Sequence, residues 1–236
     1  MTEPGTLPPP APLPDRVRRS VLRQAVSVGV AAGTYGLSFG ALGVAAGLDL
    51  WQTCALSLLV FTGASQFAFV AVLAAGGSGA TAVATATLLG VRNGLYGLQV
   101  TDWLQVRGIR RIAAAQLTID ESTAVGVAQD TEPARRLGFW ATGLSVLVMW
   151  NASTFVGALL GNTLGDPRRF GLDGAAAAAF TALLWPRLRS AEGRLTAGLA
   201  LVLALGVAPW VPAGIPVVVA ALAAVGMGLR RTVAAR

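Results

Sequence analysis

Three clusters of polar residues interrupt long apolar stretches of this chain, and the first lies in residues 61–67. There Ser65 and Gln66 closely follow Gly63, a residue that permits local unwinding of a helix. In a membrane each polar group requires a hydrogen-bond partner, and an unwound turn exposes backbone carbonyls to a substrate. Two interpretations stay open: a polar substrate site that includes these three residues, or a hydrogen-bonded clasp between helices.

The other two clusters carry charges. Arg92 and Tyr96 are four residues apart, so on a helix they share one face. The guanidinium could bind a substrate carboxylate or pair with an acidic residue, and the alternative is a side chain that extends to the membrane interface. Asp120 and Glu121 point about 100° apart on a helix. One of them could bind a substrate ammonium or carry a coupling proton while the other pairs with Arg92; the alternative is a solvated loop pair.

The residue types that are missing exclude most enzyme chemistry. All 18 basic residues are arginine, the chain contains neither lysine nor histidine, and Cys54 is its single cysteine. Zinc ligation, Ser-His or Cys-His catalysis and a lysine-containing phosphate loop therefore lack their residues. We expect no enzyme activity, no metal and no cofactor. The arginines flank apolar runs instead of forming one basic face, which argues against a nucleic-acid partner.

The elements that must position these clusters are membrane helices. Residues 50–91 form a run of 42 positions without a charge, whereas one bilayer crossing requires about 20 apolar residues. The pattern predicts an all-α, polytopic helical membrane protein with seven or eight spans. The clear candidate spans are 26–47, 52–75, 79–100, 137–162, 172–186, 195–208 and 212–229.

An eighth span depends on residues 112–128. With seven spans 6 loop arginines lie inside and 11 outside, which opposes the positive-inside rule. If residues 112–128 also cross, 12 lie inside and 5 outside, and both termini are cytoplasmic. The crossing places Asp120 and Glu121 near mid-membrane, at a few kcal/mol per charge. We favour the crossing, and an amphipathic helix on the membrane surface is the alternative.

Two further patterns concern organisation and packing. Six prolines fall within the first 14 residues, so residues 1–23 are predicted to form a disordered, Pro/Arg-rich cytoplasmic tail before a transporter domain over 24–230. Glycines recur every three or four residues through the first span, which predicts close packing against another helix or, alternatively, backbone exposed to a substrate path. A polar patch at residues 150–154 stays unassigned.

These clusters, taken in order, resemble the pattern of the AzlC family, the large subunits of branched-chain amino acid exporters. The matching segments are 63–67, 74–78, 91–97 and 117–121, together with residues 34–48 of the first span. The resemblance rests on motifs over roughly residues 20–130 and on hydropathy alone over 131–236. One departure concerns residues 90–93, which read Gly-Val-Arg-Asn where the family commonly has Asn-x-Arg-His, so a proton relay through that histidine is unavailable.

The resemblance implies a secondary transporter subunit in the inner, cytoplasmic membrane that exports leucine, isoleucine or valine, driven by the proton gradient. It also implies a small AzlD-like membrane subunit as partner. Matching positions make Ser65, Gln66, Arg92, Asp120 and Glu121 the site candidates, beside Gly63 and Tyr96 from the residue patterns. The alternative function is a proton or small-ion pathway without amino acid transport.

Overall fold

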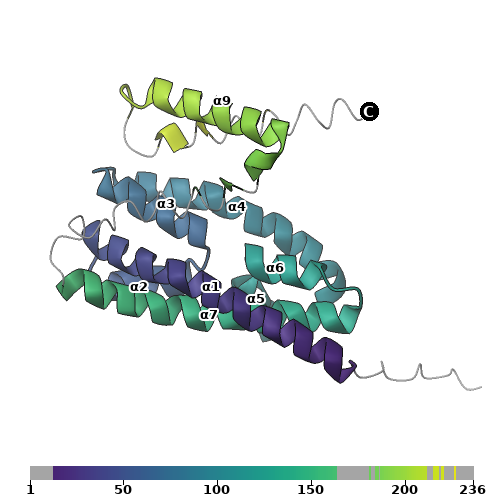
Figure 1. The fold of residues 1–236 in the computed structure, drawn as a ribbon. Coiled ribbons are helices and arrows are strands. Elements are labelled where there is room, and N and C mark those ends of the chain that lie inside the picture. The colour runs from purple at the N-terminus through teal and green to yellow at the C-terminus, as the bar shows by residue number, and fades with distance from the viewer. Residues whose placement is uncertain are drawn as a thin grey trace, which may run out of the picture.

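The computed structural model describes residues 13–163, 181, 184–185, 187–211, 215–217, 219–220 and 226. Every regular element in these ranges is helical, which confirms the all-α prediction (Figure 1). The elements are α1 (Asp15–Ala45), α2 (Leu50–Leu59), α3 (Gly63–Ala74), α4 (Gly79–Leu104), α5 (Ile109–Leu117), α6 (Asp120–Val127), α7 (Glu132–Thr163), the short 3-10 turn η2 (Arg187–Arg189) and α9 (Ala191–Val207).

Two of the predicted breaks between spans are capped helix starts. At the first, the Asp49 carboxylate accepts the backbone N–H of Gln52 at 2.8 Å, and the Gln52 side chain accepts the N–H of Asp49 at 3.0 Å. This reciprocal pair satisfies two donors that the first turn of α2 otherwise leaves unpaired. At the second, the Ser78 hydroxyl accepts the N–H of Thr81 at 3.2 Å and starts α4.

The two long helices α1 and α7 lie side by side and run in the same direction (Figure 1). Gly29 of α1 faces Ser145 of α7, and further along Gly40 faces the Thr154 carbonyl. A Cβ atom at either glycine would overlap those atoms, so a larger residue could not pack there. The glycine pattern of the first span therefore serves close helix packing, as the first of its two interpretations predicted.

The third long helix, α4, runs opposite to α1 and α7. Its last turn lies beside the first turns of α7, where the Arg136 Nε–H donates to the Trp103 carbonyl at 2.9 Å. The Trp103 ring also packs edge-on against Phe139, with ring centroids 5.9 Å apart. An arginine at the C-terminal carbonyls of a helix is favoured by the helix dipole.

Residues 50–74 form a helical hairpin, which we call the first hairpin, and not the single span predicted over 52–75. The helix is interrupted at residues 60–62, between α2 and α3. The Gln66 Nε2–H donates to the Ser57 carbonyl at 3.0 Å. If α2 and α3 continued in one line, these residues would lie about 13 Å apart along the axis. Because no glutamine side chain reaches that far, α3 must fold back beside α2.

Residues 109–127 form a second hairpin, α5 and α6, where a span over 112–128 was predicted. Four residues connect the end of α4 to the start of α5, and the end of α5 at Leu117 faces Gly143 of α7. Helix α6 then returns, so that Gly126 lies against the Trp103 ring at the end of α4. Both interpretations of this segment, a crossing and a surface helix, are thus replaced by a hairpin with a buried tip that includes Ile119.

The two hairpins enter the bundle from opposite ends, and as a result the arginines collect at one end of the bundle. Nine arginines lie at the end where α1 and α7 begin. They belong to α1, to the connection from α4 to α5, to the first turn of α5 and to the start of α7: 16, 18, 19, 23, 107, 110, 111, 135 and 136. We call this the arginine-rich end. Within residues 13–163 the opposite end carries no arginine, and Arg92 lies between the two ends, within α4.

Among the described residues, α1 and α7 are long and apolar enough to cross a membrane. Helix α4 has 26 residues but carries Arg92 and Asn93 near its middle. Helix α1 already begins at Asp15, so the last part of the predicted tail is helical, whereas residues 1–12 lie outside the described residues. Helix α9 corresponds to the predicted span 195–208. The candidate spans 172–186 and 212–229 fall mostly outside the described residues.

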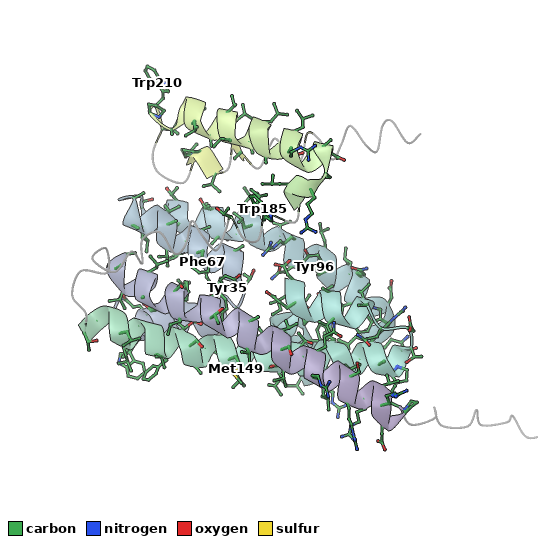
Figure 2. The ribbon with its side chains drawn as sticks, viewed as in Figure 1. Tyr35, Phe67, Tyr96, Met149, Trp185 and Trp210 are labelled. Carbon is green, nitrogen blue, oxygen red and sulfur yellow. The ribbon has the colours of Figure 1, made fainter. Side chains whose placement is uncertain are left out.

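Three aromatic rings join α1, α3 and α7 in the core. Phe39 is fully buried and lies edge-on to Phe67 and stacked on Trp150, with ring centroids 5.7 and 6.1 Å apart. Figure 2 shows Phe67 on α3, within the bundle and beside α1. Offset and edge-on aromatic pairs are favourable beyond the area that they bury. This cluster fixes α3, and with it the tip of the first hairpin, against the two parallel helices.

Candidate functional site

The site is built at the tip of the first hairpin, which Gln66 holds closed. Its side-chain nitrogen donates to the carbonyl of Ser57 at 3.0 Å and approaches that of Leu56 at 3.5 Å. Its side-chain oxygen accepts the indole N–H of Trp150 at 3.0 Å. Gln66 is 0% exposed and engaged at both ends of its amide. The structure therefore places it in the clasp that the sequence left as one of two alternatives.

The tips of the two hairpins touch. The Gln116 Nε2–H at the end of α5 donates to the Leu58 carbonyl at the end of α2, at 2.7 Å. The Ser57 hydroxyl meets the Thr154 hydroxyl of α7 at 3.2 Å. The carbonyls of the last turn of α2 would otherwise lack partners, because a helix end leaves four of them unpaired. The second hairpin thus satisfies a backbone carbonyl at the tip of the first.

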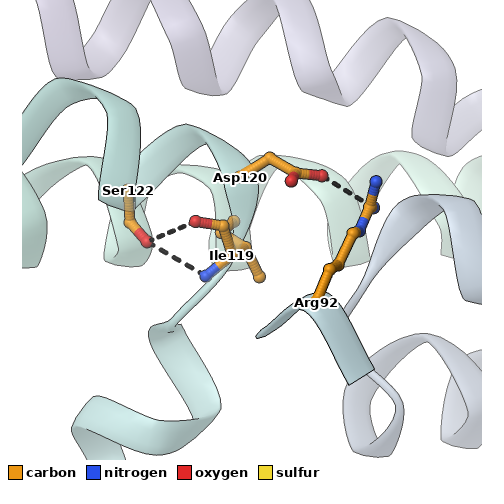
Figure 3. Close-up of polar contacts among 4 residues, drawn as sticks. All are labelled: Arg92, Ile119, Asp120 and Ser122. Carbon is orange, nitrogen blue, oxygen red and sulfur yellow. Dashed lines mark hydrogen bonds and ion pairs between the residues drawn. The ribbon is translucent and has the colours of Figure 1, made fainter. Parts of the chain in front are cut away.

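The two returning helices differ in how their N-termini are satisfied. In α6 the third residue is Ser122, whose hydroxyl accepts the N–H of Ile119 at 3.2 Å (Figure 3). The same hydroxyl donates to the Leu117 carbonyl at 2.5 Å. In α3 the third residue is Ser65, and Thr62 before the helix makes no side-chain cap. The Ser65 hydroxyl is buried, with the residue 1% exposed, and has no hydrogen-bond partner among the described residues.

A pocket of about 560 Å³ lies beside this uncapped helix start, and we call it the α3 pocket. Its polar members are Ser65, Thr62 and Thr87, and its remaining lining is apolar or glycine. It is lined by Leu56, Val60, Thr62, Ser65, Phe69, Val83, Ala86, Thr87, Gly90, Val91 and Gly94. Gly90 lies directly opposite the serine, since a Cβ atom at that position would be in van der Waals contact with the Ser65 hydroxyl oxygen, at 3.5 Å.

An ion pair joins α4 to the tip of the second hairpin. The guanidinium Nη2 of Arg92 lies 2.7 Å from a carboxylate oxygen of Asp120, with the two side chains 36% and 41% exposed (Figure 3). The sequence left a pair with Asp120 as one of several alternatives for Arg92. Glu121, the neighbouring acid, is half-buried and forms no ion pair with a described residue.

A second pocket, of about 330 Å³, lies on the α6 side of this ion pair, and we call it the α6 pocket. It is lined by Tyr96, Gln99, Asp120, Thr123, Ala124, Val127 and Ala128. Figure 2 shows Tyr96 on α4 where that helix faces α6. The Thr123 hydroxyl is buried and has no hydrogen-bond partner among the described residues.

The two pockets lie on opposite faces of α4. Successive residues of a helix are rotated by about 100°, so Tyr96 and Gln99 project away from the face that carries Gly90 and Gly94. Arg92 shares the face of Tyr96 and Gln99. The structure therefore places Ser65 at one pocket, and Tyr96 and Asp120 at another. Arg92 contacts the second pocket only through its ion pair with Asp120, and Gly63 faces the Trp150 ring, so the predicted residues do not form a single site.

Several residues of the site were missed in the sequence. Trp150 and Thr154 belonged to a polar patch that stayed unassigned, and both bind the first hairpin. Gln116 is a lone amide in an apolar run, which is a signal that its partner lies deep in the bundle. Gly90 and Thr87 gave no signal of their own, because small residues are common in membrane helices.

The first hairpin offers both poles that a zwitterion requires. The carbonyl end of α2 and the amide end of α3 meet across three residues, 60–62. Helix dipoles make the amide end favourable for a carboxylate and the carbonyl end favourable for a cation. Among the described residues no group of three His, Cys, Asp or Glu side chains could hold a metal ion. The arrangement suits a small molecule with two opposite charges.

Comparison with known proteins agrees with this architecture. A family profile described as AzlC protein matches residues 27–164, which is more than half of the 236-residue chain and contains both hairpins. Comparisons with curated proteins and with solved structures found no match. The matched region includes α1 from residue 27 onward and nearly the whole of the bundle up to the end of α7, and α1 and α7 are the two described helices suited to cross a membrane. The chain therefore belongs to the AzlC family and is a transport-associated, helical membrane protein.

Proposed function

We propose that this chain is the large subunit of a secondary transporter that exports small apolar amino acids, with leucine, isoleucine and valine as the preferred substrates. The α3 pocket carries this proposal. It joins an uncapped helix N-terminus and a buried serine hydroxyl without a described partner to a largely apolar cavity. A branched-chain amino acid is likewise polar at one end and apolar at the other, since its two charged groups lie together and the rest is a compact hydrocarbon.

The charged end of the substrate binds at the hairpin tip. Its carboxylate accepts hydrogen bonds from the first N–H groups of α3 and from the Ser65 hydroxyl, which no described residue engages. Its ammonium faces the last carbonyls of α2, near Val60. Leucine-sized hydrocarbon fits between Phe69 and Val83 on the two walls of the pocket. Transporters of other folds use broken helices in the same way.

The distribution of arginines supports an orientation in the cell membrane. Positive residues are enriched in cytoplasmic loops, and nine arginines lie at the end where α1 begins, against none at the opposite end of residues 13–163. We place the N-terminus in the cytoplasm of an inner-membrane protein. Over the same nine arginines, seven spans would give four inside and five outside, and eight spans six inside and three outside. The two hairpins keep all nine at one end, because the connections from α4 to α5 and from α6 to α7 both lie there.

Energy for export comes from an ion gradient in this proposal. The chain has no lysine, so a phosphate-binding loop of the usual kind cannot form in it. Asp120 and Glu121 are the candidate carriers of a coupling proton, at the tip of the second hairpin. The partner is a small AzlD-like membrane subunit. A proton or small-ion pathway that works without an amino acid is the alternative outcome of the test.

Efflux from cells tests the proposal. Cells are preloaded with leucine, isoleucine or valine as dipeptides and express this chain with or without an AzlD-like subunit. We expect faster efflux only when both proteins are present, and collapse of the difference with an uncoupler. A Gly90→Val variant, which narrows the α3 pocket, should lose leucine efflux while it still inserts. Unchanged efflux of all three amino acids, with the protein shown to be in the membrane, would refute the proposal.

A further inference from the structure

The α6 pocket has its own binding chemistry, independent of the α3 pocket. Its polar groups are the Asp120 carboxylate, the Thr123 hydroxyl, the Gln99 amide and the Tyr96 phenol, and its apolar wall includes Ala124. Thr123 is only 5% exposed, and its hydroxyl has no hydrogen-bond partner among the described residues. A buried hydroxyl without a partner costs about 1–3 kcal/mol. A ligand group in the pocket would remove that cost.

The ion pair beside this pocket is also incompletely satisfied. Arg92 contacts Asp120 through Nη2, while its buried Nε–H has no hydrogen-bond partner among the described residues. A guanidinium has five N–H donors and binds carboxylates best through two of them. The single 2.7 Å contact therefore leaves donors of Arg92 for a second carboxylate.

We propose that the α6 pocket is a second substrate site that binds amino acid zwitterions, and that the Arg92–Asp120 ion pair is the gate that the zwitterion opens. The substrate ammonium replaces Arg92 at Asp120 and donates to the Thr123 hydroxyl. The substrate carboxylate replaces Asp120 at Arg92. This inference rests on the proposed function, and it adds a site on the opposite face of α4 from the α3 pocket.

Charge balance explains why the gate selects a zwitterion. Before opening, one ion pair satisfies two charges; after opening, two ion pairs satisfy four charges, so that neither protein charge stays unpaired. An amine without a carboxylate would leave Arg92 without a counter-charge, and a carboxylate without an amine would do the same to Asp120. An unpaired charge inside a membrane protein is expensive. The gate thus disfavours ligands of a single charge.

The location of the pocket gives the site a place on the transport path. Val127 and Ala128 lie where α6 returns to the arginine-rich end, whereas the α3 pocket extends along α4 toward Val83, near the opposite end. The two pockets are separated by α4 and by the hairpin tips. The α6 pocket is therefore the site nearer the arginine-rich end, which the proposed orientation makes cytoplasmic, and it receives the substrate first.

Binding stoichiometry tests this inference. The full-length chain in lipid nanodiscs is titrated with radiolabelled leucine, and we expect two sites per chain. The Thr123→Val variant keeps the size of the side chain and should weaken one site at least fivefold. Asp120→Asn should abolish that same site, and Gly90→Val should abolish only the other. Thermal unfolding of each variant shows that it is folded.

Competition with two leucine analogues tests the zwitterion requirement. 3-Methylbutylamine lacks the carboxylate of leucine, and 4-methylpentanoate lacks its ammonium. Both should displace leucine from the Asp120-dependent site at least tenfold more weakly than unlabelled leucine does. An amine that competes as well as leucine would overturn the gate.

The outcomes separate this inference from the proposed function. A single leucine site that Gly90→Val removes and Asp120→Asn and Thr123→Val leave intact would overturn the second site alone. The absence of any leucine site would overturn both proposals. Two sites that respond to the variants as described would support both.

Discussion

At the scale of single residues, two serines in the same helical position differ in their hydrogen bonding. Ser65 and Ser122 are each the third residue of a helix that returns from a hairpin tip. The Ser122 hydroxyl hydrogen-bonds to the backbone of its own hairpin tip, at the N–H of Ile119 and the carbonyl of Leu117. Ser65 has no such bond and lines the α3 pocket. The chain therefore contains a natural control for the role of a serine at this position.

Removing the two hydroxyls should have opposite consequences. We expect Ser65→Ala to raise the KM for leucine about 5- to 30-fold, the equivalent of about 1–2 kcal/mol for one hydrogen bond to a carboxylate. Its thermal stability should not fall, because its hydroxyl bonds no described residue. Ser122→Ala should instead lose about 1 kcal/mol of stability, as a lost cap does. Efflux kinetics and thermal unfolding measure the two effects, and equal KM values for Ser65→Ala and the unmodified chain would contradict the assignment.

At the scale of elements, close contact between α1 and α7 forms the frame against which the hairpins pack. Glycines on both helices make this possible: Gly40 faces the Thr154 carbonyl, and Gly157 faces the carbonyl of Leu37. Between membrane helices, packing of this kind replaces the hydrophobic effect as the source of association. The frame also positions Trp150, which holds Gln66 and thereby the first hairpin.

A single methyl group added at one of these glycines should therefore push α1 and α7 apart. Gly40→Ala adds a Cβ atom that would overlap backbone of α7, so we expect a loss of several kcal/mol or no folded protein. Gly97→Ala is the matched control, because no described atom lies within 4 Å of its added Cβ. Alanine favours a helix by up to about 1 kcal/mol over glycine, so this control should be as stable as the unmodified chain. Thermal unfolding in detergent compares them, and equal stability of Gly40→Ala would argue against the close contact.

The contact between the hairpin tips is the other element-scale feature with a functional consequence. Gln116 binds the Leu58 carbonyl, so the tips must part if the hairpins move during transport. A chain with Leu58→Cys, Gln116→Cys and Cys54→Ala should lose efflux when a short bifunctional thiosulfonate cross-linker joins the two new cysteines through disulfides. Dithiothreitol should restore it. Either single cysteine variant serves as control, and full efflux from the linked protein would show that the tips stay together.

At the scale of the whole molecule, the hairpins decide which loops share a side of the membrane. Helices α1, α4 and α7 extend between the two ends, whereas each hairpin returns to the end from which it came. The connection from α4 to α5 and that from α6 to α7 therefore lie at the arginine-rich end. The connection from α3 to α4 lies at the opposite end.

Labelling of single cysteines tests this topology. In a Cys54→Ala background, Arg107→Cys and Asp130→Cys should react with a membrane-impermeant maleimide from the cytoplasmic side, and Gly77→Cys only from the other side. Positions 107 and 130 are exposed, and position 77 is half-buried. The prediction from eight continuous spans differs, since it places positions 107 and 130 on opposite sides. Labelling of 107 and 130 from different sides would reject the hairpin at residues 109–127.

Several residues of the candidate site stand out in the sequence, because polar residues in apolar runs are costly and therefore conspicuous. This held for Ser65, Gln66, Arg92 and Asp120, each of which lies at a hairpin tip or an ion pair. The division of these residues between two pockets could not be found. It depends on which face of α4 meets which hairpin, and every face of that helix carries small or apolar residues.

The sequence by itself determined the all-helical class of the protein and two of its breaks, at Asp49 and at Ser78, because hydrocarbon admits few charges and requires every backbone group to be paired. Only the tertiary structure decided that residues 50–74 and 109–127 turn back. A polar break in an apolar run looks the same whether the chain continues or reverses. The direction is chosen by partners distant in sequence, here Gln116 for Leu58 and Trp150 for Gln66, which satisfy the broken helix ends.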